Sequence, residues 1–331
     1  MNKTYLITLT PMGKFFFGGD MTFTVNGKET DYTSYIIRST KFPQQTSLLG
    51  MLRFLILRND TSAFNALSQS ITDRDKAREL IGAKSFEASG GKGSFGVIDS
   101  ISPCFVQEKN GNGWDDLALI PKGTLYKVDF SAPSKAVING MVVDVPQTDY
   151  NPKDYCETSY RNTRNDAVIE ESKIFAEDIC NGINRDIQTG KTDDNALFKQ
   201  VSYRLNEDYR FAFYADVDLA CFSDYNKQIV SVGADNSQFV IGISECKCVN
   251  DEKSEGNVVT LLSPAYITKE DLASVRFAIT ETTSFKCMKT ETDSIKSYNK
   301  RNQLYGYSNK LSLYATGSVF FFKTESEASN R

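Results

Sequence analysis

The segment from Arg38 to Arg58 constrains the fold more than any other part of the chain. Pro43 fixes its own φ and disfavours a helical conformation in the residue before it, so we expect a strand to end there. Thr46 or Ser47 can then cap a helix, because a hydroxyl accepts a hydrogen bond from the free N–H groups of the first turn. From Leu48 to Leu57 nearly every residue is apolar. A helix that is apolar on almost all sides belongs in the interior of a domain.

The same segment also carries positive charge. It contains four cations and no acid: Arg38, Lys41, Arg53 and Arg58. Gly50 costs the helix about 1 kcal/mol relative to Ala, which indicates that another group passes close to its backbone. Free amides and cations at a helix start can bind phosphate, but the same pattern is typical of plain structural capping. Arg53 can contact RNA or pair with a buried carboxylate.

The length and composition are those of an ordinary globular protein. The 331 residues, 40% hydrophobic and 24% charged, suffice for one large or two medium domains. No run of 18 apolar residues occurs, so we expect no transmembrane helix. The first residues, MNKTYLITLTPMGK, lack the apolar core of a signal peptide. We therefore expect a cytoplasmic protein without a membrane partner.

The chain contains no histidine. This removes the commonest general acid or base near neutral pH and the commonest transition-metal ligand, although lysine, tyrosine or paired carboxylates can replace it in some enzymes. Seven scattered cysteines indicate reduced thiols. Their one close pair, Cys246 and Cys248, lacks the further ligands that a zinc site needs. We expect no enzymatic activity, no metal and no cofactor.

Periodicity predicts a protein rich in strands. Thr4–Thr10 alternates apolar and polar residues, and Asn181–Ile187 and Leu197–Leu205 are predicted strands around a turn. Residues 62–82 are predicted to be helical, with Thr72 as N-cap and Gly82 just past the end. The closing sequence SVFFF predicts a strand that is buried in a sheet.

Two further segments mix cations with aromatic residues, a composition that can grip RNA. The first, residues 146–166, combines two arginines with three tyrosines: Arg161, Arg164, Tyr150, Tyr155 and Tyr160. By composition alone, a plain solvated loop is the more common interpretation of such a segment. The second, Lys286 to Lys310, has six Lys or Arg and two acids in a chain of net charge −4.

Five motifs occur in an order that resembles a known family. They are KFPQQTSLLGMLR, CNGINRDIQTGKTDDNALFKQVSYRL, VSVGADNSQF, VTLLSPAYI and KLSLYATGSVFFF. This series resembles the third subunit of the Cmr complex, a type III-B CRISPR effector, within the RAMP superfamily. The chain departs from the family pattern at Gln44 and Thr316, where prolines are frequent, and at Ala234, where a second glycine is usual.

The resemblance implies an α+β protein of two packed RRM-like (ferredoxin-like) folds, with glycine-rich loops and a projecting β-hairpin. We place the two domains at residues 1–205 and 206–331. It further implies a non-catalytic subunit that holds the 5′ tag of the crRNA. Such a subunit bridges the large polymerase-like subunit to the first backbone subunit and meets target RNA only indirectly. The alternatives are a stand-alone RAMP endoribonuclease that processes repeat RNA, and an unrelated β-rich interaction protein.

We expect the helix start at Gln45–Gly50 and the loop at Lys300–Lys310 to form two walls of one RNA groove. Amides and cations would hold phosphates, and Tyr305 or Tyr307 would stack on a base. The residues expected to contact RNA are Arg38, Lys41, Gln44, Gln45, Thr46, Ser47, Gly50, Arg53, Arg161, Arg164, Arg185, Arg301, Tyr305, Gly306, Tyr307, Asn309 and Lys310.

Overall fold

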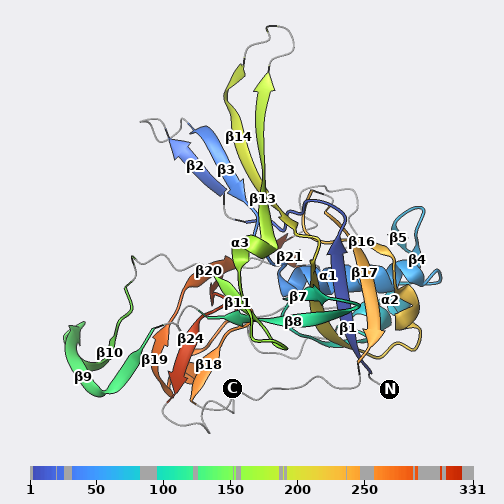
Figure 1. Cartoon of the computed structure of the whole chain (residues 1–331). Coiled ribbons are helices and arrows are strands. Elements are labelled where there is room, and N and C mark those ends of the chain that lie inside the picture. The colour runs from blue at the N-terminus through green and yellow to red at the C-terminus, as the bar shows by residue number, and fades with distance from the viewer. Residues whose placement is uncertain are drawn as a thin grey trace. The chain divides into compact units, whose positions relative to one another are not determined.

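The protein has a mixed α+β fold made mostly of strands, with few helices among the residues described (Figure 1). The computed structural model describes residues 3–19, 21–25, 32–82, 95–121, 126–151, 153, 158–185, 189, 192–235, 237–246, 257–285, 288–289, 306–307 and 311–322. Within that part of the chain, no helix is long and apolar enough to cross a membrane.

The chain divides into two compact units, each built from several segments. The first unit comprises Met1–Ala83, Ser94–Asp116 and Ser172–Cys248. The second comprises Lys84–Gly93, Leu117–Glu171 and Val249–Arg331. The domain boundary expected after residue 205 falls inside the first unit, between two consecutive strands.

The first unit contains an antiparallel sheet around a central strand. β1 (Lys3–Pro11) lies between β15 (Tyr209–Val217) and β17 (Gln238–Glu245), and it is antiparallel to both. β7 (Phe105–Asn110) pairs with the other side of β15, and β16 (Ile229–Ser231) with the other side of β17. The predicted strand at Thr4–Thr10 is therefore confirmed as the centre of a sheet.

Two shorter pairings complete this sheet. β6 (Ile98–Ile101) also pairs with β15, and β8 (Gly113–Ile120) follows β7 at the edge of the first unit. The inward side chains of β1 have at most 1% of their surface exposed: Tyr5, Ile7 and Leu9. These alternate positions share one face of the strand, as the period of two predicts.

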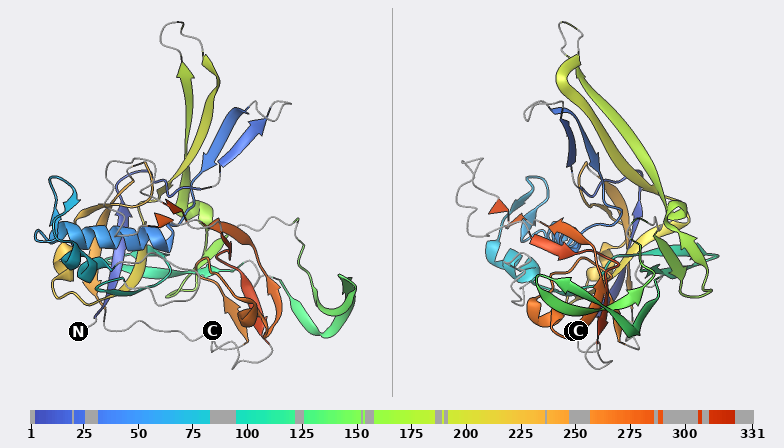
Figure 2. Two further views of the ribbon diagram at one scale, coloured as in Figure 1. Left: turned by 180° about the vertical axis from the view of Figure 1, so that it is seen from behind. Right: turned by 90° about the vertical axis from the view of Figure 1, so that its left-hand side faces the viewer.

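Helix α1 (Gln45–Asn59) lies against one face of this sheet (Figures 1 and 2). Leu48, Leu52, Leu55 and Ile56 are completely buried. The apolar run in the sequence therefore forms a core helix, as predicted. Burying a leucine side chain of this kind contributes about 1.5–3 kcal/mol.

Helix α2 (Arg74–Ile81) is shorter than the helix predicted for residues 62–82. The residues before it instead form a small hairpin of β4 (Phe64–Asn65) and β5 (Ser70–Ile71). The N-cap is Asp73, not Thr72 as predicted: its carboxylate accepts hydrogen bonds from the amides of Asp75 and Lys76, at 3.1 and 3.0 Å. A carboxylate is a strong acceptor, so it satisfies two amides of the helix start. Gly82 ends the helix at φ 71°, as predicted.

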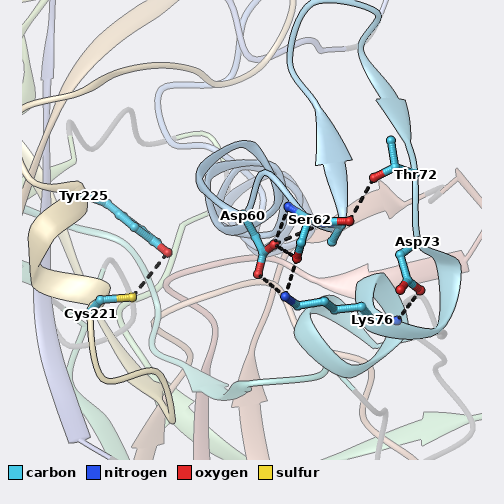
Figure 3. A network of polar contacts seen from close by, with 8 residues as sticks. Asp60, Ser62, Thr72, Asp73, Lys76, Cys221 and Tyr225 are labelled. Carbon is cyan, nitrogen blue, oxygen red and sulfur yellow. Dashed lines mark hydrogen bonds and ion pairs between the residues drawn. The ribbon is translucent and has the colours of Figure 1, made fainter.

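A polar network joins the end of α1 to α2 (Figure 3). The Asp60 carboxylate accepts hydrogen bonds from the Ser62 hydroxyl at 2.5 Å and from the Ala63 amide at 3.1 Å. The Lys76 ammonium lies 3.3 Å from the same carboxylate. The Ser62 hydroxyl is the main cause that lowers the pKa of Asp60. This carboxylate therefore holds the two helices together in its charged form.

A short helix, η2 (Phe222–Tyr225), lies beside this network (Figure 3). The Tyr225 hydroxyl is 3.6 Å from the Cys221 sulfur, and burial raises the pKa of Tyr225. Phe222 is completely buried, with its ring centroid 5.0 Å from that of Tyr5 on β1. The helix η2 thus packs against the central sheet.

A second sheet of the first unit extends away from the first one (Figures 1 and 2). β13 (Phe175–Arg185) and β14 (Thr192–Leu205) form a long antiparallel hairpin. β3 (Tyr32–Arg38) runs parallel to β14, and β2 (Met21–Val25) pairs with β3. The predicted hairpin in this part of the sequence exists, and its first strand begins earlier than expected. The short helix α3 (Glu171–Ile174) precedes it.

The second unit holds the C-terminal strands. β24 (Val319–Phe322) lies between β18 (Val258–Thr260) and β19 (Val275–Ile279), and the side chains of Phe320 and Phe322 are buried. The predicted buried strand at SVFFF is confirmed. The short helix α4 (Lys269–Leu272) precedes β19.

Further strand pairings belong to this unit. β20 (Thr282–Phe285) pairs with β23 (Leu311–Tyr314), and β21 (Met288–Lys289) with β22 (Gly306–Tyr307). β11 (Ser159–Asn162) lies between β12 (Val168–Glu170) and the end of β8. β9 (Val128–Ile138) and β10 (Met141–Thr148) form a separate hairpin.

Candidate nucleic-acid interface

The start of α1 is partly exposed: Gln44 is exposed, and the residues of the first turn are half-buried. The N-cap is Gln44, with φ −65° and ψ 145°, and no described side chain caps the first turn with a hydrogen bond. The predicted hydroxyl cap at Thr46 or Ser47 is therefore wrong. The extended conformation next to Pro43 lets the helix begin at once, which places both hydroxyls inside the first turn. The positive end of the helix carries no acidic residue in this turn.

Four hydrogen bonds stabilise this first turn, and two of them use the amides of Ser47 and Leu48. The carbonyl oxygen of Gln44 accepts from the amides of Ser47 and Leu48, at 2.9 and 3.2 Å. The Thr46 hydroxyl lies 3.5 Å from the Gln44 side-chain oxygen. The Gln45 side-chain amide donates to the carbonyl oxygen of Ile101 at 3.4 Å. Within the described part of the chain, the amides at the very start of the helix thus have no side-chain cap.

Gly50 lies on the exposed side of α1. A Cβ atom built there would have no described atom within 4 Å. Among the described residues, no group thus passes close to Gly50. Phe54, one turn further on, is 47% exposed. Residues three and four apart share a helix face, so the first turn, Gly50 and Phe54 form one open stripe.

Arg53 borders this stripe and is half-buried. Its guanidinium carbon lies 5.3 Å from the centroid of the Phe95 ring, within the range of a cation–π interaction. Burial lowers the pKa of Arg53. An arginine side chain is effectively always protonated in proteins, so Arg53 keeps its positive charge. The charge is therefore held against the side of the helix.

Arg38 and Lys41 meet at one aromatic residue, Tyr203 on β14. The Arg38 guanidinium donates to the Tyr203 hydroxyl at 3.3 Å and contacts the Glu177 carboxylate. These two hydrogen bonds raise the pKa of Arg38. The Lys41 ammonium lies 5.5 Å from the centroid of the Tyr203 ring. Both cations are thus positioned just before α1 begins.

The backbone between Arg38 and Lys41 is held by contacts with the segment from Phe17 to Gly19. The buried Ser39 hydroxyl accepts from the Phe17 amide at 2.8 Å and donates to the carbonyl oxygen of Thr40 at 2.7 Å. The Thr40 amide donates to the carbonyl oxygen of Gly18 at 2.8 Å. A Cβ atom at Gly19 would lie 1.8 Å from the carbonyl oxygen of Arg38. Only glycine fits at this close crossing.

The loop from Phe15 to Gly18 is also held by the turn after β16. The Ser237 hydroxyl accepts from the Phe16 amide at 2.9 Å, and the Ala234 amide donates to the Phe16 carbonyl oxygen at 2.8 Å. Gly233 has φ +86°, and a Cβ there would lie 2.5 Å from that carbonyl oxygen. The fully buried Phe15 pairs with Tyr203 by backbone hydrogen bonds of 2.8 and 3.1 Å.

Segments of three sequence motifs thus converge on one loop. Tyr203 and Ala234 lie in two of the motifs, and Thr40 directly precedes a third. Each hydrogen bonds through its backbone to the loop from Phe15 to Gly18. Sequence reasoning missed Ser39, Gly19 and Tyr203 as parts of the site. The Gly18-Gly19 pair after three phenylalanines is typical of a tight turn. No local pattern, however, indicates that this turn contacts the backbone of Arg38.

The remaining predicted residues lie elsewhere. Arg161 on β11 is 3.8 Å from the Asp166 carboxylate, and the Arg164 amide donates to the Asn162 side chain at 2.9 Å in the turn that follows. Tyr160 is 4% exposed and donates from its hydroxyl to Glu171, at 3.3 Å. It is thus a core residue, and the expectation that it contributes to an RNA-gripping surface is wrong.

Arg185 ends β13 opposite Thr192, far along the hairpin. Gly306 and Tyr307 form β22 in the second unit. Arg301, Tyr305, Asn309 and Lys310 lie outside the described residues. The expected groove would join the helix start in the first unit to this loop in the second, and it stays a prediction.

The arrangement at the helix start suits binding more than catalysis. It presents a helix start without a side-chain cap, two cations and the exposed Gly50 and Phe54, and amides and cations of this kind hold phosphate oxygens. Cations and hydrogen-bond donors converge there together with one carboxylate, Glu177, which pairs with Arg38. Tyr203 and Glu177 hold Arg38 in its charged form.

Comparisons with known proteins agree with the motifs. A family model described as CRISPR-associated protein (Cas_Cmr3) matches residues 148–331, more than half of the chain. A search of curated proteins finds no significant relative.

Solved structures provide the remaining comparisons. The chain is similar to one in a cryo-EM structure of the type III-B Cmr-beta bound to cognate target RNA. The identity is 14%, the match covers 96% of this chain and 86% of that one, and the TM-score is 0.50. The same complex with AMPPnP gives 14% identity, 98% and 86% coverage, and a TM-score of 0.49. For a chain in a crystal structure of the Csm3–Csm4 subcomplex of the type III-A interference complex, the identity is 13%. The match covers 97% of this chain and 93% of that one, and the TM-score is 0.38. The first likeness shows a shared fold, and by the family match the chain belongs to the CRISPR-associated Cas_Cmr3 family.

Proposed function

We propose that this chain is a non-catalytic crRNA-binding subunit of a type III-B CRISPR effector complex. It holds the 5′ tag of the crRNA and bridges the large polymerase-like subunit to the first backbone subunit. Target RNA reaches it only indirectly, through the crRNA. The observation that carries this proposal is the open, cationic start of α1, where Arg38 and Lys41 are held over Tyr203.

The strand order of the first unit supports an RRM-like fold. β1 lies between β15 and β17, and β7 lies on the far side of β15, all antiparallel. In chain order these strands are β1, β7, β15 and β17. Helix α1 follows β1, and η2 follows β15. In a ferredoxin-like βαββαβ unit the first strand likewise lies between the third and fourth strands. The second unit supplies the other RRM-like fold of the pair.

RNA binding uses the helix start in two ways. Phosphate oxygens accept from amides at the helix start, which has no side-chain cap, and pair with Arg38 and Lys41. The missing side chain at Gly50 lets a nucleotide backbone approach α1, because nothing described lies within 4 Å of that position. Tyr305 or Tyr307 stacks on a splayed base.

The absence of histidine in all 331 residues supports a non-catalytic role. RNA cleavage and second-messenger synthesis then belong to other subunits. The rival function is a stand-alone RAMP endoribonuclease that processes repeat RNA. It would cut repeat RNA by itself, whereas a scaffold subunit would bind the RNA and leave it intact.

The test is to express the tagged chain with its effector subunits and a CRISPR array, and to sequence the 5′ ends of the RNA that copurifies. We expect one shared 5′ end that derives from the repeat, and no cleavage when the purified chain meets repeat RNA without metal. Absence of bound RNA, or cleavage by the chain alone, would overturn the proposal.

A further inference from the structure

The hairpin of β9 and β10 carries an exposed apolar end. Val137 pairs with Val142 and Ile138 with Met141 across the Asn139–Gly140 turn. We call these four residues the hairpin tip. Their exposed fractions are 71% for Val137, 54% for Ile138, 67% for Met141 and 64% for Val142. Both turn residues have positive φ, 50° and 80°, which makes the turn tight. The hairpin tip is the densest group of exposed large apolar residues in the described part of the chain.

The other end of this hairpin is anchored. The Phe130 ring lies 5.9 Å from the Phe321 ring and 6.4 Å from the Phe277 ring, between centroids. The Arg276 guanidinium lies 4.1 Å from the Phe130 ring and donates to the Phe130 carbonyl oxygen at 3.4 Å. In Figure 1 the hairpin extends from this anchor away from β19 and β24. Its apolar residues thus lie where their own unit does not cover them.

An isolated two-stranded hairpin is marginally stable in water, and a contiguous apolar patch marks an interaction surface. Between Phe130 and Val145 the hairpin has two charged residues, Lys135 and Asp144, which lie opposite each other in register. A nucleic acid requires an excess of cations, and so does an anionic membrane surface. The charge balance therefore favours a protein surface as the partner.

The strands also limit how a partner can bind. Pro133 on β9 and Pro146 on β10 each lack an N–H donor, and the register shifts between Val145 and Gln147. A second strand could not extend the ladder without interruption, which disfavours edge pairing with another copy of this chain. Docking must use side chains. Methionine adapts well to an apolar pocket, so Met141 suits such a role.

We propose that the hairpin tip inserts into a hydrophobic cleft on a different protein subunit of the effector complex. This inference rests on the proposed function, which makes the chain a subunit of such a complex. The hairpin acts as an anchored arm: its base is fixed by aromatic packing, and its tip supplies the buried apolar centre of a protein interface.

The test compares reconstituted complexes that contain the full chain. The variant Ile138→Ser/Met141→Ser removes apolar surface from the tip, and Leu262→Ser, at a residue that is 58% exposed elsewhere in the second unit, is the matched control. We expect the tip variant to lower the recovery of one protein subunit by about tenfold or more, as truncation of a central apolar side chain does in other interfaces. The control should recover every subunit.

A photo-crosslinking residue at position 141 identifies the contacted chain in the wild-type complex. Crosslinking to one other protein subunit would support the inference. Crosslinking to RNA or to a second copy of this chain would overturn it, as would full subunit recovery with the tip variant. If the wild-type chain itself assembled with no subunit or RNA, the proposed function would fail first, so the two failures are distinguishable.

Discussion

The Lys41 ammonium lies 5.5 Å from the centroid of the Tyr203 ring, whose hydroxyl accepts a hydrogen bond from Arg38 at 3.3 Å. Tyr203 is buried, with 3% of its surface exposed. One aromatic residue on a distant strand thus orients the two cations that precede α1. Their charges are placed by the fold and do not depend on flexible side chains alone.

Replacing both cations should weaken RNA binding without unfolding the protein. We expect the Arg38→Ala/Lys41→Ala variant to bind crRNA less tightly and to reduce the slope of log K against log salt by about 0.7 for each phosphate that it no longer neutralises. Fluorescence anisotropy with a labelled 5′-tag RNA measures both quantities. Lys109→Ala, an exposed cation on β7, is the control. Equal slopes for the double variant and the control would contradict an RNA role for these cations.

The Gly50→Ala variant should be more stable than the wild type but should bind RNA less tightly. The added methyl group meets nothing within 4 Å, so the free energy of unfolding should rise by about 0.5–1 kcal/mol in an exposed helical position. RNA that approaches this position should bind less tightly to the variant. Urea unfolding and RNA titration measure the two effects, with Glu79→Ala on the exposed face of α2 as control. A more stable variant with unchanged affinity would show that RNA does not approach Gly50.

Gly19→Ala should destabilise the first unit because its Cβ would lie 1.8 Å from the Arg38 carbonyl oxygen. Overpacking of this kind costs about 1–3 kcal/mol. Gly13→Ala is the matched control, since a Cβ there meets nothing within 4 Å, and its effect should stay within about 0.5 kcal/mol. Fluorescence of the single tryptophan, Trp114 in the first unit, follows unfolding in urea. Equal stability of the two variants would contradict the close crossing.

Acid should weaken the link between α1 and α2. The Ser62 hydroxyl, followed by the Ala63 amide and Lys76, lowers the pKa of Asp60 below its unfolded value near 4. The unfolded state then binds the proton more readily. The stabilisation is present above about pH 4 and is lost as the pH falls through the folded pKa.

Urea unfolding, followed by Trp114 fluorescence, measures this decline in stability between about pH 6 and pH 3. This pH range spans the unfolded pKa of an aspartate. Asp60→Asn should lower stability at the upper end of the range and reduce the further decline toward the lower end. Glu207→Gln, at an exposed loop position, is the control. A variant that declines with pH as steeply as the wild type would show that Asp60 does not contribute to the pH dependence.

Local patterns were sufficient to predict the elements that depend on periodicity. The apolar run of α1, the alternation of β1 and the closing strand β24 each appear where the sequence predicted them. Capping was harder to predict. Thr46 and Thr72 were equally good caps by residue type, but Gln44 and Asp73 precede the helices because the chain enters them at other points.

The candidate site was predictable only in part. The cations before α1 were identified, but their common partner Tyr203 was not, because the parallel pairing of β3 with β14 joins distant segments. Tyr160 was misread for a similar reason. Its polar neighbours in the sequence suggested a loop, whereas pairing of β11 with β8 and β12 buries its ring.

The parallel pairing of β3 with β14 also has a consequence for the order of events during synthesis. Arg38 and Tyr203 are 165 residues apart. At about 5–20 residues per second, a ribosome needs roughly 8–33 seconds to produce the second residue after the first. Until then β3 has β2 but lacks its second neighbour β14, and the start of α1 lacks the ring that orients its cations. The start of α1 therefore acquires its arrangement of cations late in synthesis, and a nascent chain released before Tyr203 would carry the basic motif without the ring that orients it.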